Sequence, residues 1–436
     1  MSAPFERGEL TWLFGIEDTC VYPVDPAATP LDEHELTGHT AAWRSDLELA
    51  RSLGASAIRY GVSWPLVHLG PDEYDWTVLD EVLPYAVQQL GLTIVADLVH
   101  YGTPRWLPQS FADPGYPQAI ESFAAAFATR YRDLVSHFTP LNEPVTTASF
   151  CGLRGIWPPS LTGWDGWVAV AVPIALGMVR STRAIRAAHP GATIVHVEAA
   201  TVVHTDEPAL DDHARLLQGV GWLPTDLMVG RVDARHPLRG WLQEHGARVD
   251  ELEYLVAHPE LPDLIGVNYY PDLTPRRLTF VGGSAKQVSY DRGAHGLGES
   301  MRAFADRYGL PIAVTETSIE GDDAARERWL RESVAEVRAL VADGVDVRGY
   351  TWWPLFDFVD WSWAAGGSNV EEFVVELATA DGETVIAPAP PLGDPVAGKE
   401  AFLRRMGLVR LSERADGSLE RIVTPPALAF EEVTRD

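Results

Sequence analysis

The sequence is poor in cysteine and in basic residues, and both shortages exclude classes of protein. Only Cys20 and Cys151 occur in 436 residues, which rules out a disulfide framework and a four-thiolate zinc site. Lysine and arginine total 34 against 62 aspartates and glutamates, so the formal net charge is −28. Because nucleic acid and anionic membranes repel such a surface, we expect neither as the main partner.

Long apolar runs are also missing, and we expect no targeting segment. No apolar run reaches about 18 residues without a charged residue interrupting it, so no bilayer-spanning helix is expected. Residues 1–7 show no basic start followed by an apolar core, and we therefore expect a cytoplasmic protein. The chain has no Gly-x-Gly-x-x-Gly turn, no phosphate loop and no zinc-ligand spacing, so we expect neither a cofactor nor a metal.

The composition is that of a folded protein with many aromatic side chains. Apolar residues make up 46% and charged residues 22%, which excludes a disordered chain. The 15 tryptophans are many for this length. Because a buried indole N–H needs a partner, they suggest flat apolar faces for ligands such as sugar rings, with ordinary core packing as the alternative.

Short apolar runs alternate with helical patterns along the chain. Eight strands are predicted, at Leu10–Ile16, Ala57–Trp64, Leu92–His100, Ser136–Glu143, Thr193–Ala199, Leu264–Tyr270, Ile312–Glu316 and Val347–Trp353. Helices are predicted between them at Trp43–Leu53, Val78–Leu90, Ile120–Leu134, Trp167–Ala188, Gly298–Tyr308 and Ala324–Ala342. This alternation predicts an α/β protein with the (β/α)8 TIM-barrel fold.

We expect residues 1–436 to form a single barrel domain with elaborated βα loops. No linker or charge block marks a domain boundary. An irregular, proline-rich insertion is expected at about 364–399, followed by a closing segment at 400–436. The sequence leaves the oligomeric state open, a homo-oligomer included.

Polar residues stand at or just beyond the ends of several predicted strands, where the active sites of such barrels lie. They are Arg59, His100, Asn142, Glu143, Asn268, Tyr270, Glu316, Trp353, Asp360 and Trp361. The two glutamates, Glu143 and Glu316, suggest hydrolysis of a glycosidic bond. In that reaction a protonated carboxyl helps the leaving oxygen depart, while an ionised one attacks the anomeric carbon or activates water.

Six segments in a fixed order carry a family resemblance. They are Ile58–Trp64, Val99–Leu107, Thr139–Pro144, Ile265–Tyr270, Ile312–Glu316 and Asp343–Asp357. Together they resemble the motifs of glycoside hydrolase family 1, whose members are β-glycosidases on a (β/α)8 barrel. The tail from Gly407 to Leu428 resembles the closing strand and helix of the same family.

The resemblance implies hydrolysis of a small β-glycoside by double displacement with retention, without a cofactor. Glu143 would be the general acid/base and Glu316 the nucleophile. Arg59 would keep Glu316 ionised, since a nearby cation lowers the pKa of a carboxyl group. Tyr270 would hydrogen-bond Glu316.

The resemblance also implies which residues bind the terminal sugar. Asn142 would hold its 2-hydroxyl group, His100 would bind another hydroxyl and Trp353 would form the floor. The remaining sugar-binding residues would be Asn268, Asp360 and Trp361.

Several positions that would contact the sugar depart from the family pattern. Tyr22 stands near the position of a glutamine, and Glu17 or Asp18 would face the site instead. Asp360 replaces a longer glutamate, and Val145 replaces a tryptophan on the leaving-group side. We therefore expect a terminal sugar other than plain glucose, or an unusual aglycone. The pattern that grips a sugar phosphate is missing, which disfavours a phosphorylated sugar.

Three other functions compete with this interpretation. A transglycosidase would use the same site with an acceptor alcohol in place of water. A non-catalytic carbohydrate-binding barrel would leave Glu143, Glu316 and Arg59 without a reason to occur together. A metal-dependent barrel hydrolase would need His and Asp ligands at several strand ends, where only His100 is available.

Overall fold

The computed structural model describes residues 4–368, 374–378, 384–388 and 398–435. The predicted insertion at about 364–399 therefore lies in large part outside the described residues. Within it, the backbones of β17 (Val374–Ala378) and β18 (Thr384–Pro388) pair antiparallel.

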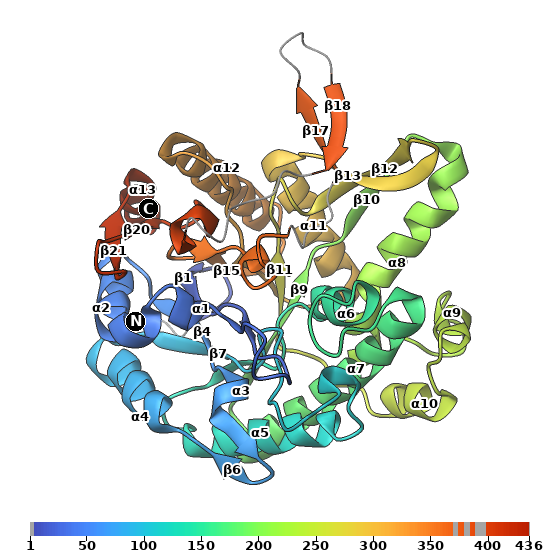
Figure 1. The fold of residues 1–436 in the computed structure, drawn as a ribbon, viewed down its shortest axis with the longest axis horizontal. Coiled ribbons are helices and arrows are strands. Elements are labelled where there is room, and N and C mark those ends of the chain that lie inside the picture. The colour runs from blue at the N-terminus through green and yellow to red at the C-terminus, as the bar shows by residue number, and fades with distance from the viewer. Residues whose placement is uncertain (1–3, 369–373, 379–383, 389–397, 436) are drawn as a thin grey trace.

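Eight parallel strands close into a barrel in the order β1-β15-β14-β11-β9-β8-β7-β4 (Figure 1). They are β1 (Thr11–Ile16), β4 (Ala57–Gly61), β7 (Thr93–Asp97), β8 (His137–Thr139), β9 (Thr193–Ala199), β11 (Leu264–Asn268), β14 (Ile312–Glu316) and β15 (Val347–Trp352). All eight predicted strands are present, and the predicted TIM barrel is confirmed. Because β1 pairs with both β4 and β15, the barrel has no free edge.

Helices surround this barrel on the outside (Figure 1). The predicted ones are α2 (His39–Ser52), α4 (Thr77–Pro84), α5 (Tyr116–Arg130), α7 (Gly163–Ala188), α11 (Gly293–Tyr308) and α12 (Asp323–Ala342). A π-helical turn at Tyr85–Gln89 extends α4. The sequence did not predict α8 (Asp211–Met228), α9 (Arg239–Glu244) and α10 (Val249–Ala257), which follow β9.

Among the described residues, only α7 is long and apolar enough to span a bilayer by length and composition. Its most apolar stretch is 67% buried inside the protein, and the helix packs along α5. Such burial is typical of a core helix, because a membrane-spanning helix would present this surface to lipid instead.

A second sheet and the C-terminal segment build walls beside the barrel. The sheet has the order β10 (Val202–His204), β12 (Pro275–Val281), β13 (Ser284–Ser289), β17 and β18. In the C-terminal segment, β19 (Leu403–Arg404) pairs with β16 (Phe358–Val359), and β20 (Val409–Glu413) pairs with β21 (Leu419–Val423). The last helix, α13 (Pro425–Val433), places Phe430 4.4 Å from Phe14 of β1 between ring centroids.

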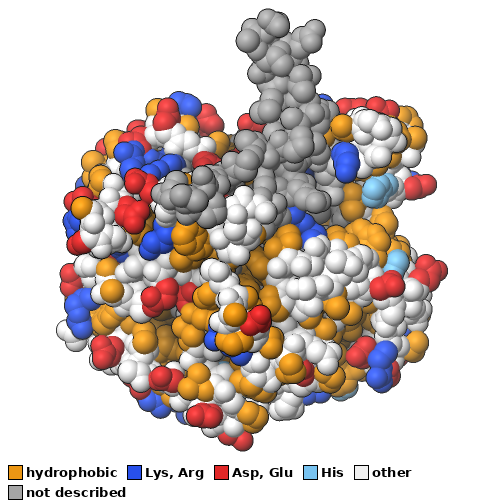
Figure 2. Space-filling view, viewed as in Figure 1, with side chains coloured by type: hydrophobic (Ala, Val, Ile, Leu, Met, Phe, Trp, Pro, Cys, Tyr) orange, Lys and Arg blue, Asp and Glu red, His pale blue; other side chains and the backbone are white. Residues whose placement is uncertain are grey.

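Apolar and charged side chains are unevenly spread over the visible face of the molecule. Figure 2 shows charged groups around its periphery and hydrophobic groups nearer its centre.

Candidate active site

Two glutamates from different barrel strands line one cavity. Glu316 is the last residue of β14, and Glu143 lies where the chain turns from β8 into α6 (Pro144–Ala148). Both are buried, with 3% and 7% of their surface exposed. Glu143 has a left-handed backbone conformation with φ 44°, a strained state for a non-glycine residue. Such strain is found mostly at functional sites, where the surrounding structure enforces it.

Arg59 of β4 is fully buried and shares its charge among three carboxyl groups. Its Nη1 lies 2.9 Å from Glu316 Oε1 and 2.6 Å from Glu17 Oε1, and its Nη2 lies 3.2 Å from Asp97 Oδ2. Nη2 also donates to Asn142 Oδ1 at 3.0 Å. One cation cannot balance three buried negative charges, so at least one of these carboxyl groups is expected to hold a proton.

Burial sets the protonation of this cluster. It raises the pKa of Glu316 to about 7, against the effect of the Arg59 cation and with a smaller upward contribution from Glu143. Burial also raises the pKa of Glu17 well above its usual range, with Arg59 opposing. The predicted lowering of the Glu316 pKa by Arg59 is thus outweighed by the loss of hydration. Because the Tyr270 hydroxyl also donates to Glu316 and so favours its charged form, we infer that Glu17 holds the proton and that Glu316 is ionised above about pH 7.

Hydrogen bonds fix the two glutamates in place. Tyr270 donates to Glu316 Oε2 at 2.8 Å. Glu143 accepts from the Tyr101 hydroxyl at 2.7 Å and from Asn268 Nδ2 at 2.8 Å. Tyr101 was not predicted from the sequence as a site residue. It could have been found as a polar side chain directly after His100, at the end of the third predicted strand.

Two further residues orient these donors. The Thr315 hydroxyl donates to Asn268 Oδ1 at 2.7 Å, which turns the amide nitrogen of Asn268 toward Glu143. Asn142 Nδ2 donates to the Tyr101 hydroxyl at 3.1 Å and lies 3.2 Å from His100 Nε2. Asn142 and Asn268 therefore act on neighbouring side chains, besides any contact that they make with a sugar.

His100 lines the cavity, and its Nδ1 atom contacts a carboxylate. Its Nδ1 lies 3.0 Å from Asp97 Oδ2. Burial alone would lower the pKa of His100, but the hydrogen bond and charge of Asp97 outweigh burial and raise it. Asp97 thus links His100 to Arg59, a role that the sequence reasoning did not assign to it.

The segments after β15 supply the other walls of this inner cavity. They contribute Trp353, Phe358, Asp360, Trp361, Arg404 and Met406. Asp360 Oδ2 lies 3.2 Å from Arg404 Nη1, and Arg404 also pairs with Glu320 at 2.9 Å. The indole of Trp353 donates to the Glu17 carbonyl at 3.0 Å, which fixes the ring beside Tyr270.

Four residues predicted to contact the sugar are not among the described residues that line this inner cavity: Asn142, Asn268, which lines a neighbouring cavity, Tyr22 and Glu17. The Tyr22 hydroxyl donates to Asp32 Oδ2 at 2.6 Å, and its ring packs under Arg105. Glu17 contacts Arg59. Neither Tyr22 nor Glu17 is among the described residues that line the cavity of Glu143 and Glu316. The position of Glu17 makes it a partner of the arginine rather than of the sugar.

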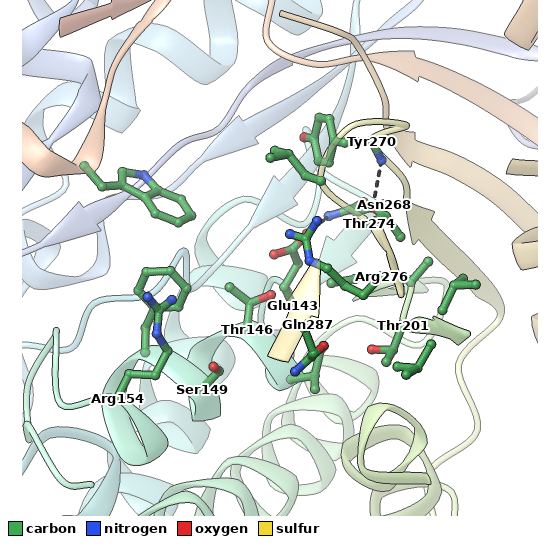
Figure 3. A pocket seen from close by; sticks show the side chains of 18 residues that line it. Glu143, Thr146, Ser149, Arg154, Thr201, Asn268, Tyr270, Thr274, Arg276 and Gln287 are labelled. Carbon is green, nitrogen blue, oxygen red and sulfur yellow. Dashed lines mark hydrogen bonds between the residues drawn. The ribbon is translucent and has the colours of Figure 1, made fainter. Parts of the chain in front are cut away.

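A second, outer cavity of about 310 Å³ adjoins the first (Figure 3). The two share Glu143, Tyr270, Leu273 and Trp361, whereas Glu316 lines the inner one only. Glu143 therefore lies where the cavities meet. A glycoside with its terminal sugar in the inner cavity would place its glycosidic oxygen at Glu143 and its leaving group in the outer cavity.

Among the described residues, no group of three or more His, Cys, Asp or Glu side chains is arranged to hold a metal ion. The polar groups of the cavities are instead paired with one another, as the contacts of Arg59, Glu143 and Asp360 show. The chemistry that the arrangement offers is proton transfer and nucleophilic attack by carboxyl groups.

Comparison with known proteins gives matches along most of the chain. The sequence model of glycosyl hydrolase family 1 matches residues 37–221 and 283–368. The chain is 24% identical to β-glucosidase 4 of Oryza sativa subsp. japonica, over 74% of this chain and 77% of that protein. It is 23% identical to an aryl-phospho-β-D-glucosidase of Bacillus subtilis (strain 168), over 74% and 78% of the two chains.

Solved structures show the same fold. The chain superposes on a β-glucosidase from Thermotoga maritima in complex with castanospermine with a TM-score of 0.78. The superposition covers 98% of this chain and 97% of that one, at 16% sequence identity. At this identity the likeness supports the barrel architecture.

Proposed function

This chain belongs to glycosyl hydrolase family 1, and we propose that it is a retaining β-glycosidase that removes the terminal non-reducing sugar of a small β-glycoside. One observation carries the proposal. Glu143 and Glu316 line the same cavity, Glu316 is held by Arg59 and Tyr270, and Glu143 lies at the entrance to a second cavity. Such a pair supports a nucleophile and a proton donor on opposite sides of one glycosidic bond.

In the first step, a carboxylate oxygen of Glu316 attacks the anomeric carbon. The bond from that carbon to the leaving oxygen breaks, and Glu143 gives its proton to this oxygen. The products are a glycosyl ester of Glu316 and the free alcohol. Arg59 and Tyr270 each donate to one oxygen of Glu316, so they keep the carboxylate oriented for attack.

In the second step, the ionised Glu143 takes a proton from a water molecule. The water oxygen attacks the anomeric carbon, and the ester bond to Glu316 breaks. Two inversions give net retention. The donors Tyr101 and Asn268 stabilise Glu143 as the carboxylate that this step requires.

The stereochemistry of hydrolysis tests this mechanism. Proton NMR of the sugar first released from an aryl β-glycoside should show the β-anomer, before mutarotation. The Glu316→Gly variant should lose hydrolysis, and azide should restore turnover with an α-glycosyl azide as product. An α-anomer from the wild-type enzyme, or full activity of the variant, would contradict the proposal.

The proposal extends to the sugar. Asp360 is shorter than a glutamate at this position and is held by Arg404, so its carboxylate lies beside a guanidinium within the inner cavity. We expect the preferred terminal sugar to differ from plain glucose, or the leaving group to be unusual. Rates on a panel of aryl β-glycosides with one common phenol test the first alternative. A wide preference for the glucoside would rule it out.

A further inference from the structure

Glu143 occupies the position that caps the first turn of α6, but its side chain does not act as the cap. Its backbone is left-handed, with φ 44° and ψ 68°, and its carboxyl group is turned into the cavities (Figure 3), where it accepts from Tyr101 and Asn268. The N–H groups at the start of a helix have no acceptor within that helix. Pro144 has no N–H, so Val145 carries the first one that needs a partner from elsewhere.

A carboxyl group from β9 supplies that partner. Glu198 is fully buried, and its Oε1 accepts from the Val145 N–H at 3.2 Å and from the Ala199 N–H at 2.9 Å. In most helices the side chain of the N-cap residue itself accepts from the second or third N–H. Here a residue 53 positions further along the chain does so. The carboxyl group of Glu143 is thereby left for the cavities.

Glu198 provides one of two attachments that bracket Glu143 on the side of β9. The strand β8 ends at Thr139, before the turn. Beyond it, the Glu143 N–H donates to the Val197 carbonyl at 3.1 Å, and the Val145 N–H donates to Glu198. The side chain of Glu143 leaves the backbone between these two hydrogen bonds, so its direction depends on both. A strained backbone conformation persists only where its surroundings enforce it, as these bonds do.

Glu198 acts through the backbone and without a charge. Among the described residues, it lines neither of the two cavities that meet at Glu143, and its Oε2 is buried with no hydrogen-bond partner. Burial raises the pKa of Glu198 well above its usual range, the Val145 N–H opposes this rise, and the nearby charge of Glu143 adds to it. A neutral carboxyl group still accepts both N–H groups through its carbonyl oxygen, and it does not repel Glu143 when Glu143 is ionised.

We propose that Glu198 is a positioning residue for the acid/base, an inference that rests on the proposed function. By holding the Val145 N–H, it keeps the turn after β8 in the conformation that directs the carboxyl group of Glu143 to the junction of the two cavities. It does not touch the substrate.

The dependence of the rate on the leaving group reports the position of Glu143. A phenyl β-glycoside needs a proton on its leaving oxygen, whereas 2,4-dinitrophenolate departs without one. If Glu143 is displaced, kcat/KM for the phenyl glycoside should fall about tenfold or more, while kcat/KM for the dinitrophenyl glycoside of the same sugar should change little. The ratio of these two values compares substrates on one protein, so a change in the amount of folded enzyme cancels.

Variants of Glu198 separate the hydrogen bond from the charge. Glu198→Met fills a similar space without an oxygen acceptor, and the ratio of dinitrophenyl to phenyl kcat/KM should rise about tenfold or more. Glu198→Gln keeps an acceptor and has no charge, so its ratio should stay close to that of the native enzyme. Glu198→Asp withdraws the acceptor by one methylene, and its ratio should also rise, which gives a second measurement if Glu198→Met does not fold.

Asp263→Ala is the matched control. Asp263 Oδ2 accepts from the Ile194 N–H at 2.8 Å, at the opposite end of β9 from Glu198. This substitution removes a carboxyl acceptor from the same strand without touching the turn of Glu143. The ratio of dinitrophenyl to phenyl kcat/KM should therefore stay native.

The outcomes distinguish this inference from the proposed function. A raised ratio in Glu198→Met, with native ratios in Glu198→Gln and Asp263→Ala, supports the inference. An unchanged ratio in Glu198→Met, or equal rises in Glu198→Met and Glu198→Gln, overturns it and leaves the proposed function standing, because the native enzyme still hydrolyses both glycosides. A native enzyme that hydrolyses neither glycoside overturns the proposed function and the inference with it.

Discussion

The Tyr101 hydroxyl donates to Glu143 Oε2 at 2.7 Å, and Asn142 Nδ2 donates to that same hydroxyl at 3.1 Å. Arg59 donates to Asn142 Oδ1 at 3.0 Å and to Glu316 Oε1 at 2.9 Å. A continuous path of hydrogen bonds therefore connects the two glutamates. Because each group in the path fixes the next, the two carboxyl groups are positioned together rather than independently.

The variant Tyr101→Phe removes one of the two side-chain donors to Glu143. A buried carboxylate that loses a donor costs about 1–3 kcal/mol, so we expect a loss of about tenfold or more in rate. The second chemical step should suffer most, since Glu143 must be ionised to activate water. Steady-state kinetics on an activated aryl glycoside should show kcat falling more than kcat/KM.

A matched control for Tyr101→Phe is Tyr350→Phe. Tyr350 is fully buried in β15, and its hydroxyl pairs with Ser333 at 2.8 Å, outside the described lining of both cavities. Loss of the Tyr350 hydroxyl should lower the free energy of unfolding without changing the ratio of kcat to kcat/KM. Equal kinetic effects of the two variants would contradict the role of Tyr101.

The activity should depend on the ionisation of Glu316. Burial raises the pKa of Glu316 to about 7, and only the ionised carboxylate attacks. Hence kcat/KM should fall about tenfold per pH unit below about pH 7. A neutral substrate measured between about pH 4 and 9 gives the profile. A fall in kcat/KM that begins only near pH 4 would show that Arg59 lowers the pKa of Glu316 by more than burial raises it.

Glu17→Gln tests where the shared proton resides. Burial raises the pKa of Glu17 well above its usual range, so we expect a neutral side chain that an amide imitates. The acid limb of kcat/KM should stay near that of the native enzyme. A shift of more than about one pH unit to lower pH would mean that Glu17 is ionised and competes for Arg59. Glu33→Gln is the control, because Glu33 is buried and accepts from the Val359 N–H instead.

Asp360→Asn should weaken sugar binding. Asp360 lines the inner cavity and pairs with Arg404 at 3.2 Å, so the loss of its charge removes a hydroxyl acceptor and half of an ion pair. The inhibition constant of an imino sugar, which occupies the sugar site alone, should rise by about tenfold or more. Asp46→Asn removes another buried partner of an arginine, Arg421, and should leave that constant unchanged.

The sequence predicted the barrel because its strands are continuous apolar runs. Thr193–Ala199 and Ile312–Glu316 were predicted with their observed bounds. Ala57–Trp64 was predicted too long, since its last residues leave the ladder and begin the short helix α3 (Trp64–Val67). The helices of residues 211–257 and the second sheet were missed, because they follow β9 and β11 as additions to the repeating strand–helix unit.

The candidate site was predictable where its residues lie in or just after a barrel strand. Glu316 ends β14, Glu143 follows β8 and Arg59 lies within β4, and the structure brings them together. Arg404 belongs to the C-terminal segment and reaches the cavity because β19 pairs with β16, a contact between residues far apart in sequence. Tyr22 stands in the sequence near the position of the family's sugar-binding glutamine. Its hydroxyl donates to Asp32 instead, and the side chain does not line the inner cavity.

Covalent labelling with a 2-deoxy-2-fluoro β-glycoside bearing a good leaving group tests the central assignment most directly. The fluorine slows both steps, and the good leaving group lets the first outrun the second, so the glycosyl-enzyme accumulates. Peptide mass spectrometry should then find one added fluorosugar on Glu316 and none in the Glu316→Gly variant. An unlabelled enzyme that still hydrolyses glycosides, or a label on Glu17, Glu143 or another carboxylate, would contradict the account.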